Sequence, residues 1–407
     1  MFSIELFPAA YGDALWIEYG PAEKPKRILI DGGKLSAVQP ISERIRAVAA
    51  ADPAGVCRFE LAVLTHIDGD HIEGFLSLIH NMSAGKLPMH VGDILFNGAP
   101  HLPDPDENNE PAPPGLAGAE SFGALQGEML SFVLFDQKLP WNLWSSMGPI
   151  FIPKSGPLPV YELAGGLKLT LLGPTFERLQ KLREKWDHEV KAWEKKSKHK
   201  LSPEEVMELL SDRPEGRILN FAEDEGIDVR ALAEALDKED SSEPNGSSIA
   251  LLAEFEGKSC LLCGDAFARD MAGAIRRLLS ERAPKGAKPM EKLKIDALKV
   301  AHHGSRNNIS EEFLSLLDCD RFLVSTNGAV FGHPDPEAIA CIVGGKHRFE
   351  SKNLMARPRH LYFNYRSPQT TPWEGRDVEG NPLGKSYNFQ AHYPEKGKEG
   401  LKVVLAP

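Results

Sequence analysis

Cysteine and long apolar segments are the features that this sequence has least of. Five cysteines are scattered over 407 residues, which does not make a disulfide framework and favours a reducing compartment. No run of about eighteen apolar residues occurs, so no membrane-spanning helix is expected. The first residues lack a basic segment and begin like a β-strand, so no signal peptide is predicted. We therefore expect a cytoplasmic protein with no membrane partner.

Positive charge is also in short supply. The chain has 47 Lys and Arg against 58 Asp and Glu, which gives a formal net charge of −11. That balance argues against broad, non-specific binding of nucleic acid, because the phosphate backbone demands a basic surface. A local basic patch is still compatible with it. The length leaves room for one large domain or two small ones, each with a sizeable core.

Metal-type ligands crowd one short stretch that follows the apolar segment 61–64. His66, Asp68, Asp70 and His71 fall within six residues. The apolar segment is predicted to be a buried strand, and the carboxyl ends of such strands are where open α/β folds place their sites. Ordinary turn residues are the alternative interpretation. Two imidazoles and two carboxylates this close together need either solvent or a cation, so we predict a metal site.

The segment Thr65–Gly74, THIDGDHIEG, resembles the signature H-x-H-x-D-H of the metallo-beta-lactamase fold hydrolases. It departs from that pattern at Asp68, where most members have a second His. This HxDxDH variant resembles the branch that contains the hydrolase domain of bacterial DNA-uptake competence proteins. The resemblance implies an α/β fold of the αββα type, a four-layer sandwich with two sheets between layers of helices.

Two later segments resemble further signatures of the same fold. LLCGD at 261–265 resembles the motif whose Asp bridges two metals, which assigns that role to Asp265. KVAHHGS at 299–305 resembles the last motif, in which His302 aligns best with the ligand. Asp31, in a D-G-G turn, corresponds to a residue that supports the metal loop, and an ordinary turn aspartate is the equal alternative.

The resemblance implies two sets of metal ligands. His66, Asp68 and a third His would hold one ion, while Asp70, His71 and His302 would hold the other, with Asp265 between them. His101 is the candidate for the third His because it follows a predicted strand at 91–97; a surface histidine is the alternative. His80 and His90 are weaker candidates. Asp70 would also orient the hydroxide that attacks the substrate.

Four residues are expected to face the substrate. His303 is predicted to line the pocket rather than bind metal, because neighbouring histidines do not easily share one face. Ser305 and Asn307 are predicted either to cap the following helix or to hydrogen-bond the substrate. His333, in a Gly-His-Pro segment, is a candidate catalytic residue that contacts an oxyanion or the leaving group. A turn histidine held by its proline is the alternative for His333.

The extent of the resemblance implies a hydrolase domain at 1–349, followed by a carboxyl-terminal extension at 350–407 that is expected to pack on the same domain. A highly charged segment at about 176–244 has helical spacing and is predicted to be an insertion projecting from the domain, available to a protein partner. Its basic stretch 191–200 is either a solvated helix face or a patch for a phosphate-bearing partner. The loop 103–118 is expected to border the site.

These features together predict a binuclear metallohydrolase. A divalent metal lowers the pKa of bound water from 15.7 to about 7, so a metal-bound hydroxide can attack near neutral pH. Two Zn²⁺ ions are expected, with Mn²⁺ as an alternative because the carboxylate of Asp68 favours harder ions. The resemblance to the nuclease-like branch implies a phosphodiester, small or within nucleic acid, as the substrate. The alternatives are a lactone, thioester or other ester, and a metal-binding regulatory or docking protein with little catalysis.

Overall fold

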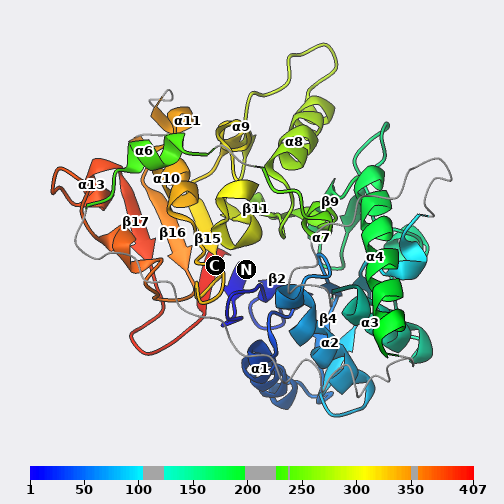
Figure 1. Cartoon of the computed structure of the whole chain (residues 1–407). Helices are drawn as coiled ribbons and strands as arrows, with labels where there is room; N and C mark the ends of the chain where they lie inside the picture. Colours follow the sequence, from blue (N-terminus) through cyan, green and yellow to red (C-terminus); the bar gives the residue numbers. More distant parts are fainter. Residues whose placement is uncertain (104–122, 198–225, 237–238, 350–355) are drawn as a thin grey trace.

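Two β-sheets packed face to face form the centre of the molecule (Figure 1). The structure, a computed structural model, describes residues 1–103, 123–197, 226–236, 239–349 and 356–407. Among these residues, the first sheet has six strands in the order β18 (Leu401–Ala406), β1 (Phe2–Leu6), β2 (Leu15–Tyr19), β3 (Lys26–Ile30), β5 (Leu61–Val63) and β7 (Ile94–Leu95). The second has eight, in the order β17 (Phe389–His392), β16 (Arg359–Phe363), β15 (Arg321–Val324), β13 (Ala297–Lys299), β11 (Lys258–Leu262), β10 (Ala250–Phe255), β9 (Lys168–Gly173) and β8 (Val160–Glu162). Two small ladders join β4 (Cys57–Phe59) to β6 (Met89–Val91) and β12 (Leu293–Lys294) to β14 (Leu317–Asp318).

The alternation of side chains along the strands divides the core into two layers. Successive residues of a strand point to opposite faces of its sheet. Ile17 of β2 therefore packs between the sheets, in one cluster with Leu251 of the second sheet. Its neighbour Trp16 packs on the other side, in a cluster with Ile45 and Phe75 from two helices. Both faces of the first sheet are thus buried.

Helices cover the outer face of each sheet. The helices that share the core of the first sheet are α1 (Val38–Ala51), α2 (Gly69–Ser83) and α3 (Gly123–Asp136). Those that share the core of the second are α8 (Ala268–Arg282), α9 (Glu311–Ser315) and α10 (Pro336–Gly344). Figure 1 shows the two groups on opposite sides of the strands. The predicted four-layer αββα arrangement is confirmed. In the described part of the chain, no helix is both long and apolar enough to cross a bilayer.

Parallel strands bring several predicted site residues to the same edge of the molecule. β3 runs parallel to β5 in the first sheet, and β11, β13 and β15 run parallel in the second. Site residues lie within three positions of the ends of four of these strands: Asp31 after β3, His66 after β5, Asp265 after β11 and His302 after β13. Carboxyl ends of parallel strands are the usual location of sites in α/β folds. The two sheets together therefore supply one site.

The charged segment at 176–244 contains helices in its described parts, but the first of them does not project from the molecule. Its elements are α4 (Phe176–Ser197), α6 (Val229–Glu234) and α7 (Glu243–Gly246). Trp186 of α4 is 1% exposed, and its indole donates to Glu128 of α3 at 2.7 Å. Figure 1 shows α4 running beside α3. Residues 198–225 and 237–238 lie outside the described residues, as does most of the predicted loop 103–118.

The carboxyl-terminal residues belong to both sheets. β16 and β17 continue the second sheet in parallel beyond β15, while β18 pairs antiparallel with β1. The two ends of the chain consequently lie side by side at the centre of Figure 1. Leu361 and Phe363 of β16 are fully buried. The short helices α11 (Lys346–Phe349) and α13 (Leu383–Ser386) complete this region.

Candidate metal centre

Four histidines surround the carboxylate of Asp265. Its Oδ2 atom lies 3.4 Å from Nε2 of His71 and 3.7 Å from Nε2 of His66, His302 and His303. These distances exceed those of ordinary N–H···O hydrogen bonds. Two donor atoms on one tetrahedral zinc ion, each 2.0–2.1 Å from it, are about 3.4 Å apart. The spacing is therefore that of atoms able to share a metal ion.

The neighbouring histidines His302 and His303 both reach Asp265, contrary to the expectation that only one of them could. Both residues have left-handed backbone conformations, with φ of 47° and 55°. The tight turn that results brings two successive side chains to one side of the chain. His303 is fully buried rather than exposed at a pocket wall. The structure therefore places the His303 side chain inside the buried cluster, beside Asp265.

Each of the four imidazole rings is held at Nδ1 by a polar partner. The partners are Asp31 Oδ2 for His71 at 2.8 Å, Ser325 O for His303 at 2.9 Å, Asn308 Oδ1 for His302 at 2.8 Å and Thr65 Oγ1 for His66 at 3.0 Å. An Nδ1–H that donates to such a partner leaves the lone pair on Nε2 for a metal. All four Nε2 atoms accordingly face Asp265.

Asp68 and Asp70 lie on different sides of this cluster. The Asp70 Oδ2 atom is 3.1 Å from Nε2 of His303, which is itself 3.2 Å from Nε2 of His71. The Asp68 Oδ2 atom is instead 3.7 Å from Nε2 of His66. Asp68 precedes α2, and Asp70 and His71 are in its first turn, so the helix start separates the two carboxylates. The ligand atoms thus fall into two groups around Asp265.

The cluster contains buried polar atoms that have no protein partner. His66 Nε2 and Asp265 Oδ1 are both shielded from solvent and without a hydrogen bond. Such atoms are costly in a protein interior unless water or an ion satisfies them. A divalent cation would satisfy both, and a set of imidazoles and carboxylates suits zinc, manganese or iron. The residues present therefore fit a metal ion, and His66, His71 and Asp265 have donor atoms within 4.8 Å of one another.

The protonation of the histidines reflects this crowding of charge. Burial, with help from neighbouring His71, lowers the pKa of His66 to about 3. Burial would also lower the pKa of His302 and of His303, but nearby carboxylates outweigh it. For His302 the carboxylate is chiefly that of Asp265, and for His303 the carboxylates are those of Asp13 and Asp265. The pKa values of His302 and His303 rise to about 10 and about 9. In the metal-free chain, protons on these two rings thus balance the buried carboxylates. A bound cation would displace those protons.

Asp13 and Lys299 support the centre and were not among the predicted site residues. Both side chains are 1% exposed and form a buried ion pair. The Asp13 Oδ1 atom also lies 3.3 Å from Nδ1 of His303. Gly12 makes this approach feasible, because a Cβ there would lie 1.9 Å from the carbonyl oxygen of Asp70. Lys299 is the first residue of the KVAHHGS segment. Its partner Asp13 lies 286 residues away in the sequence, so the motif alone did not reveal the pair.

Asp240 and Asn308 form a second support that the sequence did not reveal. The Asp240 Oδ2 atom accepts hydrogen bonds from Asn245 at 2.7 Å and from Asn308 at 2.8 Å, and lies 3.4 Å from Nδ1 of His302. Asn308 also donates to the backbone carbonyl of Asp265 at 2.9 Å. The end of the charged segment therefore reaches the centre and orients His302.

The remaining predicted residues lie in different surroundings. His101 packs edge-on against Trp141, with ring centroids 4.3 Å apart, and none of its interactions within the described residues reaches the cluster. The His333 ring lies 5.3 Å from that of His302. Ser305 caps a short 3₁₀ turn by accepting from the Asn307 backbone N–H at 3.3 Å. Asn307 lines a cavity of about 830 Å³ together with Asp240.

Comparisons with known proteins gave a match among solved structures and none by sequence. No protein-family model matches the sequence, and no curated protein matches it. Among solved structures, the chain is similar to a mutant of CmlA beta-hydroxylase, with a TM-score of 0.37 and 10% sequence identity. The match covers 89% of this chain and 52% of that one, so the chain spans about half the length of that structure.

The class of the protein follows from its own sheets and helices. Two facing sheets between helical layers, with a His and Asp cluster at the strand ends, make an α/β sandwich of the metallo-beta-lactamase type.

Proposed function

We propose that this chain is a metal-dependent hydrolase that holds two divalent ions around Asp265. The observation that carries the proposal is the set of four imidazoles, each anchored at Nδ1, whose Nε2 atoms lie 3.4–3.7 Å from one carboxylate oxygen. These spacings are longer than ordinary N–H···O hydrogen bonds, so hydrogen bonding alone does not account for the convergence of four rings on one oxygen. Shared ligation of cations does, because each ring nitrogen and carboxylate oxygen would then have a partner.

The distances favour a division of ligands that differs from the one implied by the sequence resemblance. Asp70, His71 and His303 have Nε2 and Oδ2 atoms 3.1–4.0 Å apart and would hold one ion. His66 and Asp68 would hold the other, with Asp265 common to both. His302 would complete the second set in place of His101.

The chemistry of the bound metal would be the ionisation of water, whose pKa falls from 15.7 to about 7 on such an ion. The chain itself supplies positioning. The Asp70 side chain is 12% exposed, so one of its oxygens is open to orient the attacking water. His333 has Nδ1 3.2 Å from Asp335 Oδ1, which leaves Nε2 to hydrogen-bond the departing oxygen of the substrate.

A phosphodiester is the substrate class that we propose. The support is the HxDxDH sequence at 66–71, which resembles nuclease-like members of the fold, and the carboxylate-rich ligand set. Asp68, Asp70 and Asp265 beside four imidazoles suit Mn²⁺ as well as Zn²⁺, and phosphoryl oxygens are hard ligands that such ions polarise. Hydrolysis of a lactone or another ester is the competing outcome of the test.

The test is a comparison of bis-p-nitrophenyl phosphate with a panel of lactones and thioesters, using protein loaded with Zn²⁺ or Mn²⁺. We expect turnover of the phosphodiester, and at least about a 100-fold loss in an Asp70→Ala variant. His101→Ala is the matched control, because it also removes a buried polar side chain, and His101 lies outside the cluster. This variant should keep its metal and its activity. Ester turnover without phosphodiester turnover would reassign the substrate, and two bound ions without any turnover would indicate a binding protein.

A further inference from the structure

Three aromatic side chains border the open side of the metal centre. The rings of Tyr11 and Phe331 meet edge to face with centroids 5.7 Å apart, and Phe331 stacks on His333 at 6.0 Å. His333 in turn lies 5.3 Å from His302 of the metal centre. We refer to Tyr11, Phe331 and His333 as the aromatic wall. It forms a continuous row from the metal centre to the protein surface.

Phe331, at the end of the aromatic wall, and two of the proposed metal ligands are partly exposed to solvent. The Phe331 side chain is 45% exposed although it packs against two other rings. The side chains of Asp68 and His302 are 26% and 23% exposed, whereas His66, on the inner side of the cluster, is wholly covered. A substrate that reaches the metals from solvent would therefore pass along the wall.

The aromatic wall is held in place by bonds between the loops that carry it. The Asn327 backbone N–H donates to the carbonyl of Ala10 at 2.8 Å, and Ser325 Oγ donates to the carbonyl of Gly12 at 2.9 Å. The Asp13 N–H donates to the carbonyl of Asp70, in the metal loop, at 3.2 Å. The Tyr11 turn and the Phe331 loop are thus fixed to each other and to the metal centre before any ligand arrives, which lowers the cost of ordering them on binding.

An exposed aromatic ring by itself needs no explanation, since single apolar residues are common on protein surfaces. A fixed row of rings that ends at a candidate hydrolytic centre has a specific use. Planar rings bind planar rings, and stacking of a nucleobase on an aromatic side chain gives affinity without any positive charge. That matters for a chain with a net charge of −11, which lacks the general basic surface of a nucleic-acid binder.

We infer that the aromatic wall stacks a nucleobase, so that the substrate of this centre is a short phosphodiester carrying a nucleoside. The inference rests on the proposed phosphodiesterase function and adds its substrate class. The base would lie against Phe331 while the phosphodiester lies at the cations that Asp68 and Asp70 would hold. Long nucleic acid is not favoured, because its many phosphates would meet an acidic protein.

Two substrates that differ only in the nucleoside test the inference. Thymidine 5′-p-nitrophenyl phosphate and methyl p-nitrophenyl phosphate release the same leaving group from the same type of bond. The metal-loaded protein should prefer the nucleoside substrate by about tenfold in kcat/KM, mainly through KM. Phe331→Ala should abolish this preference, Phe331→Leu should also abolish it because it lacks a ring, and Phe331→Trp should retain it.

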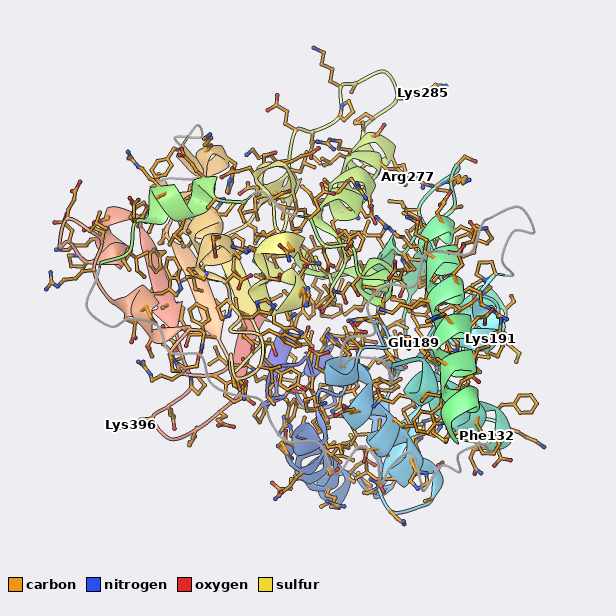
Figure 2. All side chains as sticks on the ribbon, in the orientation of Figure 1. Phe132, Glu189, Lys191, Arg277, Lys285 and Lys396 are labelled. Carbon is orange, nitrogen blue, oxygen red and sulfur yellow. The ribbon has the colours of Figure 1, made fainter. Side chains whose placement is uncertain are left out.

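Phe132→Ala is the matched control. Phe132 is 52% exposed, close to the value for Phe331, and Figure 2 shows its ring at the outer edge of the molecule on α3. This variant should keep the full preference for the nucleoside substrate. Equal preference in the wild type and in Phe331→Ala would overturn the inference while leaving the phosphodiesterase function intact.

A binding measurement separates the inference from the proposed function. Calorimetry on the metal-loaded protein would compare thymidine 5′-phosphate with 2-deoxyribose 5-phosphate, which lacks the base. We expect about tenfold tighter binding of the nucleotide, and loss of that difference in Phe331→Ala. If this holds without turnover of any phosphodiester, the base-stacking wall stands and the proposed reaction fails. Equal affinity for the two ligands would contradict the wall.

Discussion

Within the described ranges, two clusters of possible metal ligands combine histidine with carboxylate, and they differ in whether their protein groups already satisfy one another. The second cluster consists of Glu311, Cys341 and His347, whose possible ligand atoms also lie within 4.8 Å of one another. There, Glu311 Oε2 accepts from His347 Nδ1 at 2.7 Å, and the other ring nitrogen lies 3.2 Å from both terminal nitrogens of Arg359. Both ring nitrogens of His347 therefore already have a protein partner.

The two clusters differ in whether any buried donor or acceptor atom is without a hydrogen-bond partner. Around Asp265, the four Nδ1 atoms are occupied, and His66 Nε2 and Asp265 Oδ1 are buried without any hydrogen-bond partner. Around Glu311, the carboxylate also accepts from the backbone N–H groups of Lys346 and His347 at 2.8 and 3.0 Å, so the cluster is complete without an ion. Residue types near one another do not define a metal site; unsatisfied donor atoms that converge do.

Removal of the bridging carboxylate should have the largest effect. Asp265→Asn leaves the shape of the centre but removes the charge next to four imidazoles, so we expect loss of metal and at least about a 100-fold loss of turnover. Metal content by atomic spectroscopy and the phosphodiesterase assay measure this. Circular dichroism of the variant checks that the fold is retained. Full metal content in this variant would remove the distinction between the two clusters.

An intermediate effect is expected from the support of a ligand. Asp31 accepts from Nδ1 of His71 at 2.8 Å and from the Thr65 hydroxyl at 2.8 Å. Asp31→Asn keeps the size of the side chain but weakens the hold on the ring, and such partners are typically worth 10- to 100-fold in metal affinity. Competition with a chelating dye gives the affinity. An unchanged affinity would show that the Nδ1 anchors do not matter to the centre.

The smallest effect on metal is expected at the second cluster. Glu311→Gln should leave the metal content unchanged and lower the free energy of unfolding by about 1 kcal/mol, because the side chain is partly exposed. Urea unfolding at neutral pH measures the loss. Release of an ion from this variant would mean that the second cluster is also a metal site.

The pH dependence of the same variant sharpens the comparison. Burial would raise the pKa of Glu311, but the hydrogen bonds from His347 outweigh it and lower that pKa to about 2. A carboxyl group whose pKa is lower in the folded state stabilises the fold above its ordinary pKa of 4.5, and the contribution disappears as the pH falls toward 2. The difference in unfolding free energy between the wild type and Glu311→Gln should therefore shrink between pH 6 and pH 3. A difference that grows on acidification would contradict this.

The predictable parts of the centre are those in which ligand-type residues closely follow an apolar segment that reads as a strand. His66, Asp70 and His71 form a local packet after an apolar strand, and Asp265 and His302 follow strands in segments that resemble known motifs. Parallel pairing then brings these ends together. The layer arrangement was predictable for the same reason, since the apolar pattern of the strands specifies which faces are buried.

The parts that were not predictable depend on backbone conformation and on distant contacts. Nothing in the letters of His302 and His303 indicates left-handed conformations, so the convergence of both rings was missed. Asp13 pairs with Lys299 across 286 residues, and Asp240 reaches Asn308 across 68. The position of β16 and β18 in two different sheets likewise depends on pairing partners that a local pattern does not specify.

The central claim is that the side chains around Asp265 form a cage for two cations. The most direct measurement is the number of transition-metal ions per chain in the purified, metal-loaded protein after removal of loosely bound metal. The account predicts two ions per chain in the wild type and in His101→Ala. A wild-type chain that retains no ion would contradict it.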